Sequence, residues 1–427
     1  MDRPTFLAHL RRSGLVTPSE LASLLPQLPE CGDARTAARA LVVRGLLTRF
    51  QAERLLAGRS TGFVQGPYRI LEEIGRGGMG RVFKAEHRLM GRTVALKVLA
   101  PDLLKTERTR ALFLREVRAI SRLVHPNIVA AFDANEAASR YYLVLELIDG
   151  PNLEQLVRGN GPLPADRACE YVRQVARGLQ YAHALGMVHR DIKPANLLLQ
   201  RSSVDGAPGE TVKISDFGLA RLHQPDSVTE PDGMGTLVAK ANSVLGTPDY
   251  ISPEQSRSPG EADHRSDLYS LGCTFYYLLT ARVPFPGGGT VDKLMRHHTE
   301  PTPLVTEVRP EVVPAVSAIV AKLMAKAPDD RFQSAGELAD TLPPFCASGS
   351  SHWPEAVRTT TVSVSDTLVA LATATDEAQT ACRADSSRRT AAVLANQPAA
   401  AANTPSRLRA RGAVARALGL MRRAFGT

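Results

Sequence analysis

The sequence predicts an α+β fold of two lobes, a small antiparallel β lobe that carries one helix and a large, mainly helical lobe. Three observations support this prediction: β-branched runs with glycine turns begin near Tyr68, one charged helical segment follows them, and helical periodicity dominates beyond Pro151. A small helical module, residues 1–62, is expected before the two lobes. A basic, low-complexity tail, residues 344–427, is expected after them, and its composition predicts disorder.

The N-terminal module has apolar residues at helical spacing, for example Phe6, Leu7 and Leu10. Thr17 followed by Pro18 is typical of a helix N-cap with proline at the first helical position. Nothing in the module indicates chemistry, and we expect it to bind a partner protein.

The small lobe should contain strands at residues 68–71, 81–85 and 93–99, followed by a charged helix at 107–123. Two further strands are expected to end at Ile148. On this interpretation the catalytic fold is complete from the first strand onward, without the N-terminal module.

Composition narrows the location and the partners. The five cysteines lack metal-ligand spacing, and no apolar run approaches membrane-spanning length, so we expect a cytoplasmic protein. The net charge of +9 fits a solvated basic tail, and no nucleic-acid partner is expected. Residues 407–423 can form a basic amphipathic helix, for which contact with a membrane surface and a fraying tail remain open alternatives.

A glycine motif lies between the first two strands, with Gly75, Gly77 and Gly80 at the spacing GxGxxG. Glycines let the backbone lie close over phosphate groups, because no Cβ atom intervenes. Dinucleotide-binding loops share this spacing but need a helix directly after the glycines. Here a strand follows, so the motif predicts a hairpin that covers a nucleotide.

Lys97 is flanked by apolar residues in the third strand, where a buried charge needs a partner. Glu116 on the following helix is the natural partner. Such an ion pair would hold the Lys97 ammonium group against the α- and β-phosphates of a nucleotide.

The most specific signal is the run His-Arg-Asp-Ile-Lys-Pro-Ala-Asn at residues 189–196, followed by Asp-Phe-Gly from Asp216. Phosphoryl transfer needs positioning and charge neutralisation more than covalent chemistry. Asp191 fits the group that accepts the hydroxyl proton, and Lys193 can neutralise the γ-phosphate. Asn196 and Asp216 supply the oxygen ligands that Mg²⁺ prefers.

The chain from Tyr68 to Leu342 resembles the eukaryotic-like (Hanks-type) bacterial serine/threonine protein kinase family. Besides the motifs above, residues 246–255 (GTPDYISPEQ) carry the resemblance to the bacterial branch. The resemblance implies the two-lobed protein kinase fold over residues 66–343. It also implies a serine/threonine kinase that uses ATP and Mg²⁺, phosphorylates protein substrates and has a role in signalling.

The resemblance also implies a nucleotide site. Backbone groups of Glu146 and Ile148 should hydrogen-bond the adenine edge, beside Leu145 at the gatekeeper position. The residues that the resemblance assigns to this site are Ile74, Gly75, Gly77, Gly80, Val82, Ala95, Lys97, Glu146, Ile148 and Leu198.

The resemblance assigns a structural role to a further set of residues. Glu254 is expected to pair with Arg331 as a buried clamp, and Asp267 should anchor the backbone of the catalytic loop. The apolar spine that links the lobes should contain Ile120, His189 and Phe217.

The same resemblance implies which hydroxyl groups are phosphorylated and how the activity is switched on. Lys193 after the catalytic aspartate and Thr247 near it are typical of serine/threonine kinases, so dual specificity is the less favoured interpretation. Arg190, directly before that aspartate, is typical of kinases whose activation segment is ordered by phosphorylation. Ser243 and Thr236 are the preferred sites of autophosphorylation in this segment.

Two alternatives belong to other functional classes. One is a pseudokinase that serves as a scaffold, but the residues that such a protein would lack are all present: Lys97, Asp191, Asn196 and Asp216. The other is a small-molecule phosphotransferase, which has no need of the peptide-docking shelf that the segment around Glu254 predicts.

Overall fold

The computed structural model describes residues 1–28, 33–137, 140–204, 207–217, 248–258 and 262–346. All of these residues belong to one compact unit, Met1–Leu371. The basic tail from residue 347 and the amphipathic helix expected at 407–423 lie outside the described residues.

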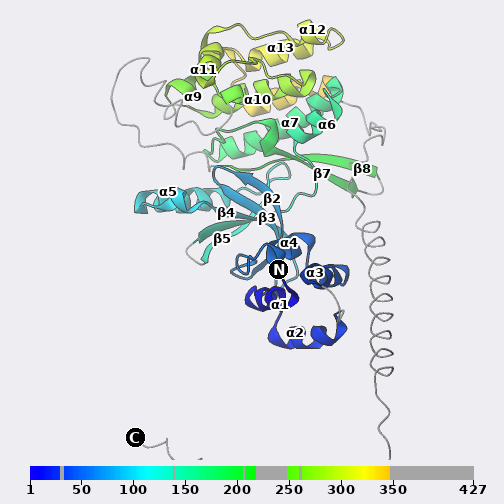
Figure 1. Cartoon of the computed structure of the whole chain (residues 1–427). Helices are drawn as coiled ribbons and strands as arrows, with labels where there is room; N and C mark the ends of the chain where they lie inside the picture. The colour runs from blue at the N-terminus through cyan, green and yellow to red at the C-terminus, as the bar shows by residue number, and fades with distance from the viewer. Residues whose placement is uncertain (29–32, 138–139, 205–206, 218–247, 259–261, 347–427) are drawn as a thin grey trace, which may run out of the picture. The chain divides into compact units, whose positions relative to one another are not determined.

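The N-terminal module consists of short helices, as its periodicity predicts (Figure 1). Thr17 caps the second helix as expected: its hydroxyl accepts a hydrogen bond from the Glu20 amide at 3.2 Å, and the Glu20 carboxylate accepts one from the Thr17 amide. The module has an apolar core of its own, centred on side chains such as Phe6 and Leu41. Its helices are α1 (Arg3–Arg12), α2 (Pro18–Leu24), a 3₁₀ turn (Leu25–Gln27), α3 (Ala34–Val43) and α4 (Arg49–Leu56).

The small lobe is a six-stranded antiparallel sheet with the strand order β1-β2-β3-β4-β6-β5. The predicted strands are present, although the last of them ends at Leu145 and not at Ile148, and the glycine motif forms the turn of the β2–β3 hairpin. The strands are β1 (Val64–Gln65), β2 (Tyr68–Gly77), β3 (Gly80–His87), β4 (Thr93–Leu99), β5 (Ala131–Ala137) and β6 (Arg140–Leu145). A 3₁₀ turn (Pro101–Leu104) leads to α5 (Glu107–Ile120), which ends earlier than the predicted Leu123.

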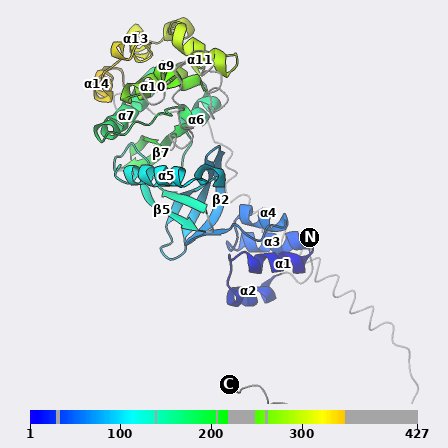
Figure 2. The same ribbon diagram turned by 90° about the vertical axis from the view of Figure 1, so that its left-hand side faces the viewer.

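The two faces of this sheet pack against different partners. On one face Phe83 and Leu96 belong to a buried cluster that also receives Phe50 of α4. On the other face Leu143, which is paired with Lys97, packs with Phe113 of α5. Because side chains alternate along a strand, α4 and α5 therefore cover opposite faces of the sheet (Figure 2).

The large lobe is built around α7 and α10, which lie in one buried apolar cluster. Cys169 of α7 and Cys273 of α10 are fully buried, as expected for small core residues. The α-helices of the lobe are α6 (Leu153–Asn160), α7 (Ala165–Ala184), α9 (Pro253–Arg257), α10 (His264–Thr280), α11 (Thr290–Thr299), α12 (Val305–Val308), α13 (Pro314–Leu323) and α14 (Ala335–Thr341). Short 3₁₀ turns lie at Pro194–Asn196, Pro248–Tyr250, Pro328–Asp330 and Pro343–Phe345.

A two-stranded hairpin, β7 (Leu197–Val204) and β8 (Ala207–Ile214), runs between the catalytic loop and Asp216. The glycines and Pro208 in residues 201–210 predict a hairpin loop there, and the structure has a hairpin whose strands stay paired out to Val204 and Ala207. Glu210 anchors the ribbon, because its carboxylate accepts two hydrogen bonds at 2.7 Å from Arg167 of α7. Among the described residues, no helix is long and apolar enough to cross a membrane.

Candidate active site

Lys97 and Asp216 connect the two lobes. The Lys97 side chain is only 5% exposed, and its Nζ donates a hydrogen bond to Oδ1 of Asp216 at 2.8 Å. Burial by itself raises the pKa of the Asp216 carboxyl group, but attraction to the Lys97 ammonium outweighs it and leaves that pKa below its usual value. Asp216 is therefore a carboxylate at neutral pH, which is the form that binds a cation.

A second carboxylate, Asp191, lies in the catalytic loop beside two donors. Nζ of Lys193 is 2.8 Å from Oδ2 of Asp191 and 3.0 Å from Oδ1. Nδ2 of Asn196 donates to the same Oδ2 at 3.0 Å and to the Asp191 backbone carbonyl at 2.8 Å. The sequence predicted that these three residues act together, and the fold places them in direct contact. Asp191 remains 39% exposed, so an acceptor hydroxyl group can reach it.

Asn196 and Asp216 also suit the predicted divalent cation. Both hydrogen bonds from the Asn196 amide group to Asp191 use Nδ2, which turns its Oδ1 oxygen away from that carboxylate. Asp216 engages Lys97 through Oδ1, and its second oxygen makes no described hydrogen bond. An amide oxygen and an ionised carboxylate are the hard oxygen donors that Mg²⁺ prefers.

Asp267, at 0% exposure, anchors the catalytic loop as predicted. Its carboxylate accepts hydrogen bonds from the backbone amides of His189 at 2.8 Å and Arg190 at 2.7 Å. His183 of α7 adds a third contact through Nε2 at 2.9 Å, which the sequence did not predict. The support matters because Arg190 has a positive φ angle of 69°, which is strained for a residue with a Cβ atom.

His189 and Phe217 pack edge to face, with ring centroids 4.6 Å apart. Nε2 of His189 lies 2.8 Å from the carbonyl oxygen of Ser215, which fixes the imidazole ring. Phe217 and Ile120 belong to the same buried apolar cluster. His189 and Phe217 of the predicted spine are thus in contact, and Ile120 lies in the same apolar cluster as Phe217.

The glycine hairpin and the site share one face of the sheet. Val82 of β3 is paired with Lys97 of β4, so both side chains project from the same face. Ala95 lies two residues before Lys97 and shares that face as well. Gly80 is required by its backbone: its φ is 145°, and an added Cβ would lie 2.1 Å from the carbonyl oxygen of Val98.

The segment that follows β6 was predicted to contact adenine. The amide of Glu146 donates to the carbonyl oxygen of Ala130 at 2.8 Å, so only the Glu146 carbonyl is left for a ligand. The Glu146 side chain faces elsewhere and forms an ion pair with Lys213 at 3.0 Å. Leu198, on the first strand of the β7–β8 hairpin, forms a bridge with Asn152 just beyond this segment.

Glu254 and Arg331 form the predicted clamp. Nη1 and Nη2 of Arg331 lie 2.7 and 2.8 Å from the two carboxylate oxygens of Glu254. Burial raises the pKa of Glu254, but the bonds from Arg331 outweigh it and lower that pKa to about 2. Arg331 is 2% exposed and has further backbone acceptors, so the ion pair is held in the core of the large lobe.

Gln255 is a functional contact that the sequence did not predict. Its Nε2 donates to the carbonyl oxygen of Arg190 at 2.9 Å, and its Oε1 accepts from the backbone amide and hydroxyl group of Ser252. Ser252 caps α9, so the capping signal Ser-Pro-Glu-Gln was visible in the sequence. The acceptor in the catalytic loop, the carbonyl oxygen of Arg190, could not be predicted from this signal because it is far away in the chain.

Some predictions are not tested by these contacts. Glu116 is buried on α5, at 7% exposure, and its ion pair with Lys97 stays a prediction. The proposed switch residues Thr236, Ser243 and Thr247 lie outside the described residues. Ile74, Gly75, Gly77 and Ile148 are positioned on the hairpin and after β6, and their contact with a nucleotide likewise stays a prediction.

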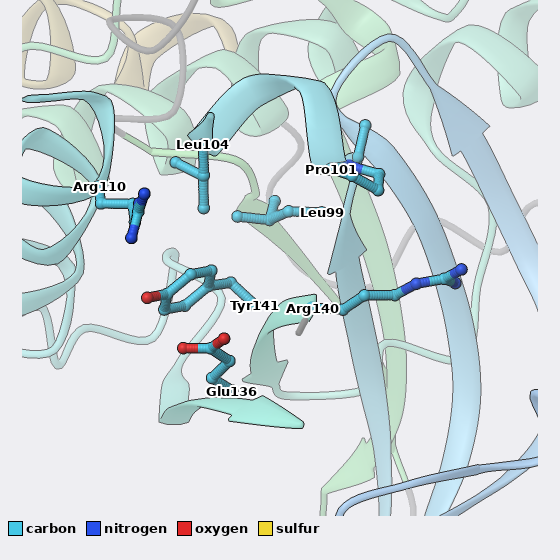
Figure 3. Close-up of a pocket in the computed structure, with 8 residues that line it drawn as sticks. Leu99, Pro101, Leu104, Arg110, Glu136, Arg140 and Tyr141 are labelled. Atoms are coloured by element: carbon cyan, nitrogen blue, oxygen red, sulfur yellow. The ribbon is translucent and has the colours of Figure 1, made fainter. Parts of the chain in front are cut away.

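A separate pocket of about 230 Å³ lies between β4, α5 and β6 (Figure 3). Leu99 and Leu104 point into it, and the Tyr141 ring lies beside the Glu136 carboxylate. Arg110 faces this pocket, whereas the guanidinium group of Arg140 extends away from it. None of the predicted site residues lines this pocket.

Similarity to known proteins is found over the residues that form the two lobes. Residues 68–341 match the family model described as "Protein kinase domain". The chain is 36% identical over 272 residues to a probable serine/threonine-protein kinase PknB of Lactococcus lactis, covering 64% of this chain and 40% of that protein. This chain therefore spans less than half the length of that curated relative.

Solved structures are similar over the same part of the chain. The PknI kinase domain of Mycobacterium tuberculosis superposes with a TM-score of 0.51 at 25% identity, covering 66% of this chain and 98% of that domain. Rad53 residues 1–466, crystallised in complex with AMP-PNP, gives a TM-score of 0.51 at 26% identity and covers 66% of both chains.

Proposed function

This chain belongs to the protein kinase domain family, and from that membership we propose that it is a serine/threonine protein kinase. It transfers the γ-phosphoryl group of ATP to serine or threonine hydroxyl groups of protein substrates. One observation supports this activity above the others: Asp191 is in contact with both Lys193 and Asn196, while Lys97 reaches Asp216 from the other lobe. Relatives that share this domain are named serine/threonine-protein kinases.

In this mechanism Asp191 orients the acceptor hydroxyl group and takes its proton as the oxygen attacks the γ-phosphorus. Lys193 neutralises charge that moves onto the γ-phosphoryl group, because its ammonium lies beside the same carboxylate. Lys97 holds the α- and β-phosphates, and Glu116 is its proposed partner once the nucleotide is bound. Backbone groups after β6 bind the adenine edge.

Magnesium is the proposed cofactor, and Asn196 and Asp216 would hold it. A bound Mg²⁺ neutralises the phosphate charge and orients the leaving group. ATP as the nucleotide is supported by the similar Rad53 structure, whose ligand AMP-PNP is an ATP analogue. We further propose a cytoplasmic location, where ATP is available.

Regulation and partners are part of this proposal. Autophosphorylation at Ser243 or Thr236 would order the activation segment through Arg190, because a phosphate accepts bidentate bonds from a guanidinium group. The N-terminal helices, residues 1–62, are proposed to bind a partner protein. Contact between residues 407–423 and a membrane surface remains an open alternative.

The test is incubation of the purified chain with Mg-ATP and a bacterial protein extract, followed by mass-spectrometric mapping of phosphorylated residues. We expect phosphoserine and phosphothreonine on the chain and on extract proteins. The Asp191→Asn variant should give neither, whereas Asp340→Asn, at an exposed position on α14, should match the wild type. ATP hydrolysis without any phosphorylated protein, or phosphorylation that survives Asp191→Asn, would contradict the proposal.

A further inference from the structure

Helix α4 of the N-terminal module is bound to strand β2 by two side-chain hydrogen bonds. Thr48 Oγ1 donates to the carbonyl oxygen of Leu71 at 2.6 Å, and Gln51 Nε2 donates to the carbonyl oxygen of Ile70 at 2.6 Å. Leu71 has no partner on β3, because the register shifts between Ile70 and Glu72. Its carbonyl group is therefore available to the helix.

The same two residues form the start of α4. The Thr48 amide donates to Gln51 Oε1 at 2.8 Å, and the Gln51 amide donates to Thr48 Oγ1 at 3.2 Å, which completes a capping box. The Gln51 side chain is buried, with the whole residue 1% exposed. Every polar group of this side chain thus serves either the helix start or β2, and the helix is fixed in both position and direction.

A charged relay continues from α4 toward the glycine motif. Nη1 of Arg54 lies 3.9 Å from Oε2 of Glu73 on β2. The Glu73 carboxylate also accepts two hydrogen bonds from the guanidinium group of Arg81 on β3, one of them at 2.8 Å from Nε. Glu73 precedes Gly75 by two residues and Arg81 directly follows Gly80, so this ion pair closes the base of the glycine turn.

The relay lies on the face of the hairpin that points away from the nucleotide site. Glu73 is paired with Phe83, whose ring lies 5.2 Å from the Arg81 guanidinium group and belongs to the cluster that receives Phe50 of α4. The neighbouring side chain, Val82, projects from the opposite face, which carries Lys97. The relay can therefore set the position of the hairpin without touching a nucleotide.

We propose that α4 positions the nucleotide-binding hairpin through Gln51 and the relay Arg54–Glu73–Arg81, so that the N-terminal module raises the affinity for ATP. The proposal rests on the proposed function only in taking ATP as the ligand. A glycine-rich turn loses much conformational freedom when it closes over phosphates, and holding its base in place beforehand reduces that loss. Arg54, Glu73 and Gln51 are thus positioning residues.

The proposal is tested on the full-length chain by titration with a fluorescent ATP analogue in the presence of Mg²⁺. We expect Arg54→Ala and Gln51→Ala to raise the Kd about two- to fivefold, which corresponds to the loss of one polar contact between α4 and β2. Glu73→Gln removes the negative charge from both arginine ion pairs and should raise the Kd about five- to tenfold. Arg54→Lys keeps the charge and should stay close to the wild type.

Matched controls separate the relay from general effects of charge. Arg49→Ala removes an arginine from the same helix at a side chain that is 84% exposed, and Glu72→Gln removes a carboxylate next to Glu73 that is exposed. Both controls should leave the Kd unchanged. Combining Arg54→Ala with Glu73→Gln should raise the Kd no further than Glu73→Gln alone, because both variants break the same relay.

A steady-state assay with a peptide acceptor gives a second measurement. If α4 positions the hairpin, the variants should have a higher KM for ATP, with kcat and the KM for peptide unchanged. General destabilisation would instead lower the melting temperature without a selective change in the KM for ATP. Wild-type Kd values in both Arg54→Ala and Glu73→Gln would overturn the relay and leave the kinase assignment intact. Nucleotide binding that follows the predicted pattern without phosphorylation of any protein would overturn the kinase assignment alone.

Discussion

Gln255 and Arg190 are joined by a hydrogen bond of 2.9 Å from the Gln255 side-chain amide to the Arg190 carbonyl oxygen. The bond connects α9 to a loop residue whose φ of 69° lies in the left-handed region. A strained backbone conformation persists only where the surroundings hold it. Gln255 is therefore one of the groups, together with Asp267, that hold the catalytic loop in this conformation.

Replacing Gln255 with Glu should weaken this support while keeping the helix cap, because a carboxylate still accepts from Ser252 but cannot donate to Arg190. We expect a loss of about 1–2 kcal/mol in the free energy of unfolding and a lower kcat, with the KM for ATP unchanged. Urea denaturation and steady-state kinetics measure both effects. Gln155→Glu is the matched control, since Gln155 caps α6 in the same way at an exposed position. Equal losses in both variants would rule out a specific role for Gln255.

The ion pair of Glu254 with Arg331 should make stability depend on pH in the acidic range. Folding lowers the pKa of Glu254 to about 2 from its usual 4.5, so the contribution of this carboxylate is complete above pH 4.5 and is lost as the pH falls toward 2. Glu254→Gln should cost about 3 kcal/mol at pH 7. The difference from the wild type should shrink below pH 4.5.

Urea denaturation of both proteins at pH 7, 5 and 3.5 measures this difference. The control is Glu311→Gln, which breaks the exposed pair with Arg309 and should change the stability little at any pH. A difference that stays constant down to pH 3.5 would show that Glu254 does not owe its effect to ionisation.

Because Lys97 contacts Asp216, we expect substitutions of either residue to have the same effect on phosphoryl transfer. Lys97→Met and Asp216→Asn should each lower phosphoryl transfer at least about 100-fold, since removing one charge from such a constellation costs several kcal/mol at the transition state. Asp191→Asn should be equally inactive but should still bind ATP, because Asp191 faces the acceptor. Nucleotide titration and a peptide phosphorylation assay distinguish the two cases. Appreciable turnover of Asp216→Asn with Mg²⁺ would exclude Asp216 as a metal ligand.

The switch in the activation segment is tested by the double variant Ser243→Ala with Thr236→Ala. We expect no autophosphorylation between residues 236 and 247 and a large fall in activity toward an external peptide. The reason is that an unphosphorylated segment leaves the peptide-docking surface unformed. Thr229→Ala, earlier in the same segment, is the control. Full activity of the double variant, with no phosphate mapped in this range, would refute the switch but not the kinase.

Part of the candidate site could be predicted from the sequence because three of its proposed residues are close together in the chain. Asp191, Lys193 and Asn196 lie within six residues of one another, so their spacing alone placed them together. Lys97 and Asp216 are 119 residues apart, and they were assigned to one site by what each must do for a phosphate or a metal. The direct bond between them was not foreseen, since Glu116 was expected as the partner of Lys97.

The attachment of α4 to β2 could not be predicted from the sequence. A local role at the start of the helix already explains the residues that make the contact. Thr48 and Gln51 form an ordinary capping box, which accounts for both residue types without any distant partner. The bonds to Ile70 and Leu71 use donors that remain after the cap is made. The prediction of a fold complete from Tyr68 did not include these contacts between α4 and β2, and it stays a prediction.

The β7–β8 ribbon restricts how this region can vary among related proteins. Glu210 must stay opposite Arg201 and within reach of Arg167, while the strands beyond it pair in register to Val204 and Ala207. Adding one residue to each strand keeps the pairing and only lengthens the ribbon. Adding a single residue to one strand would turn the following side chains to the other face or form a bulge. Insertions and deletions in the paired strands of this ribbon should therefore accumulate in steps of two residues over evolutionary time.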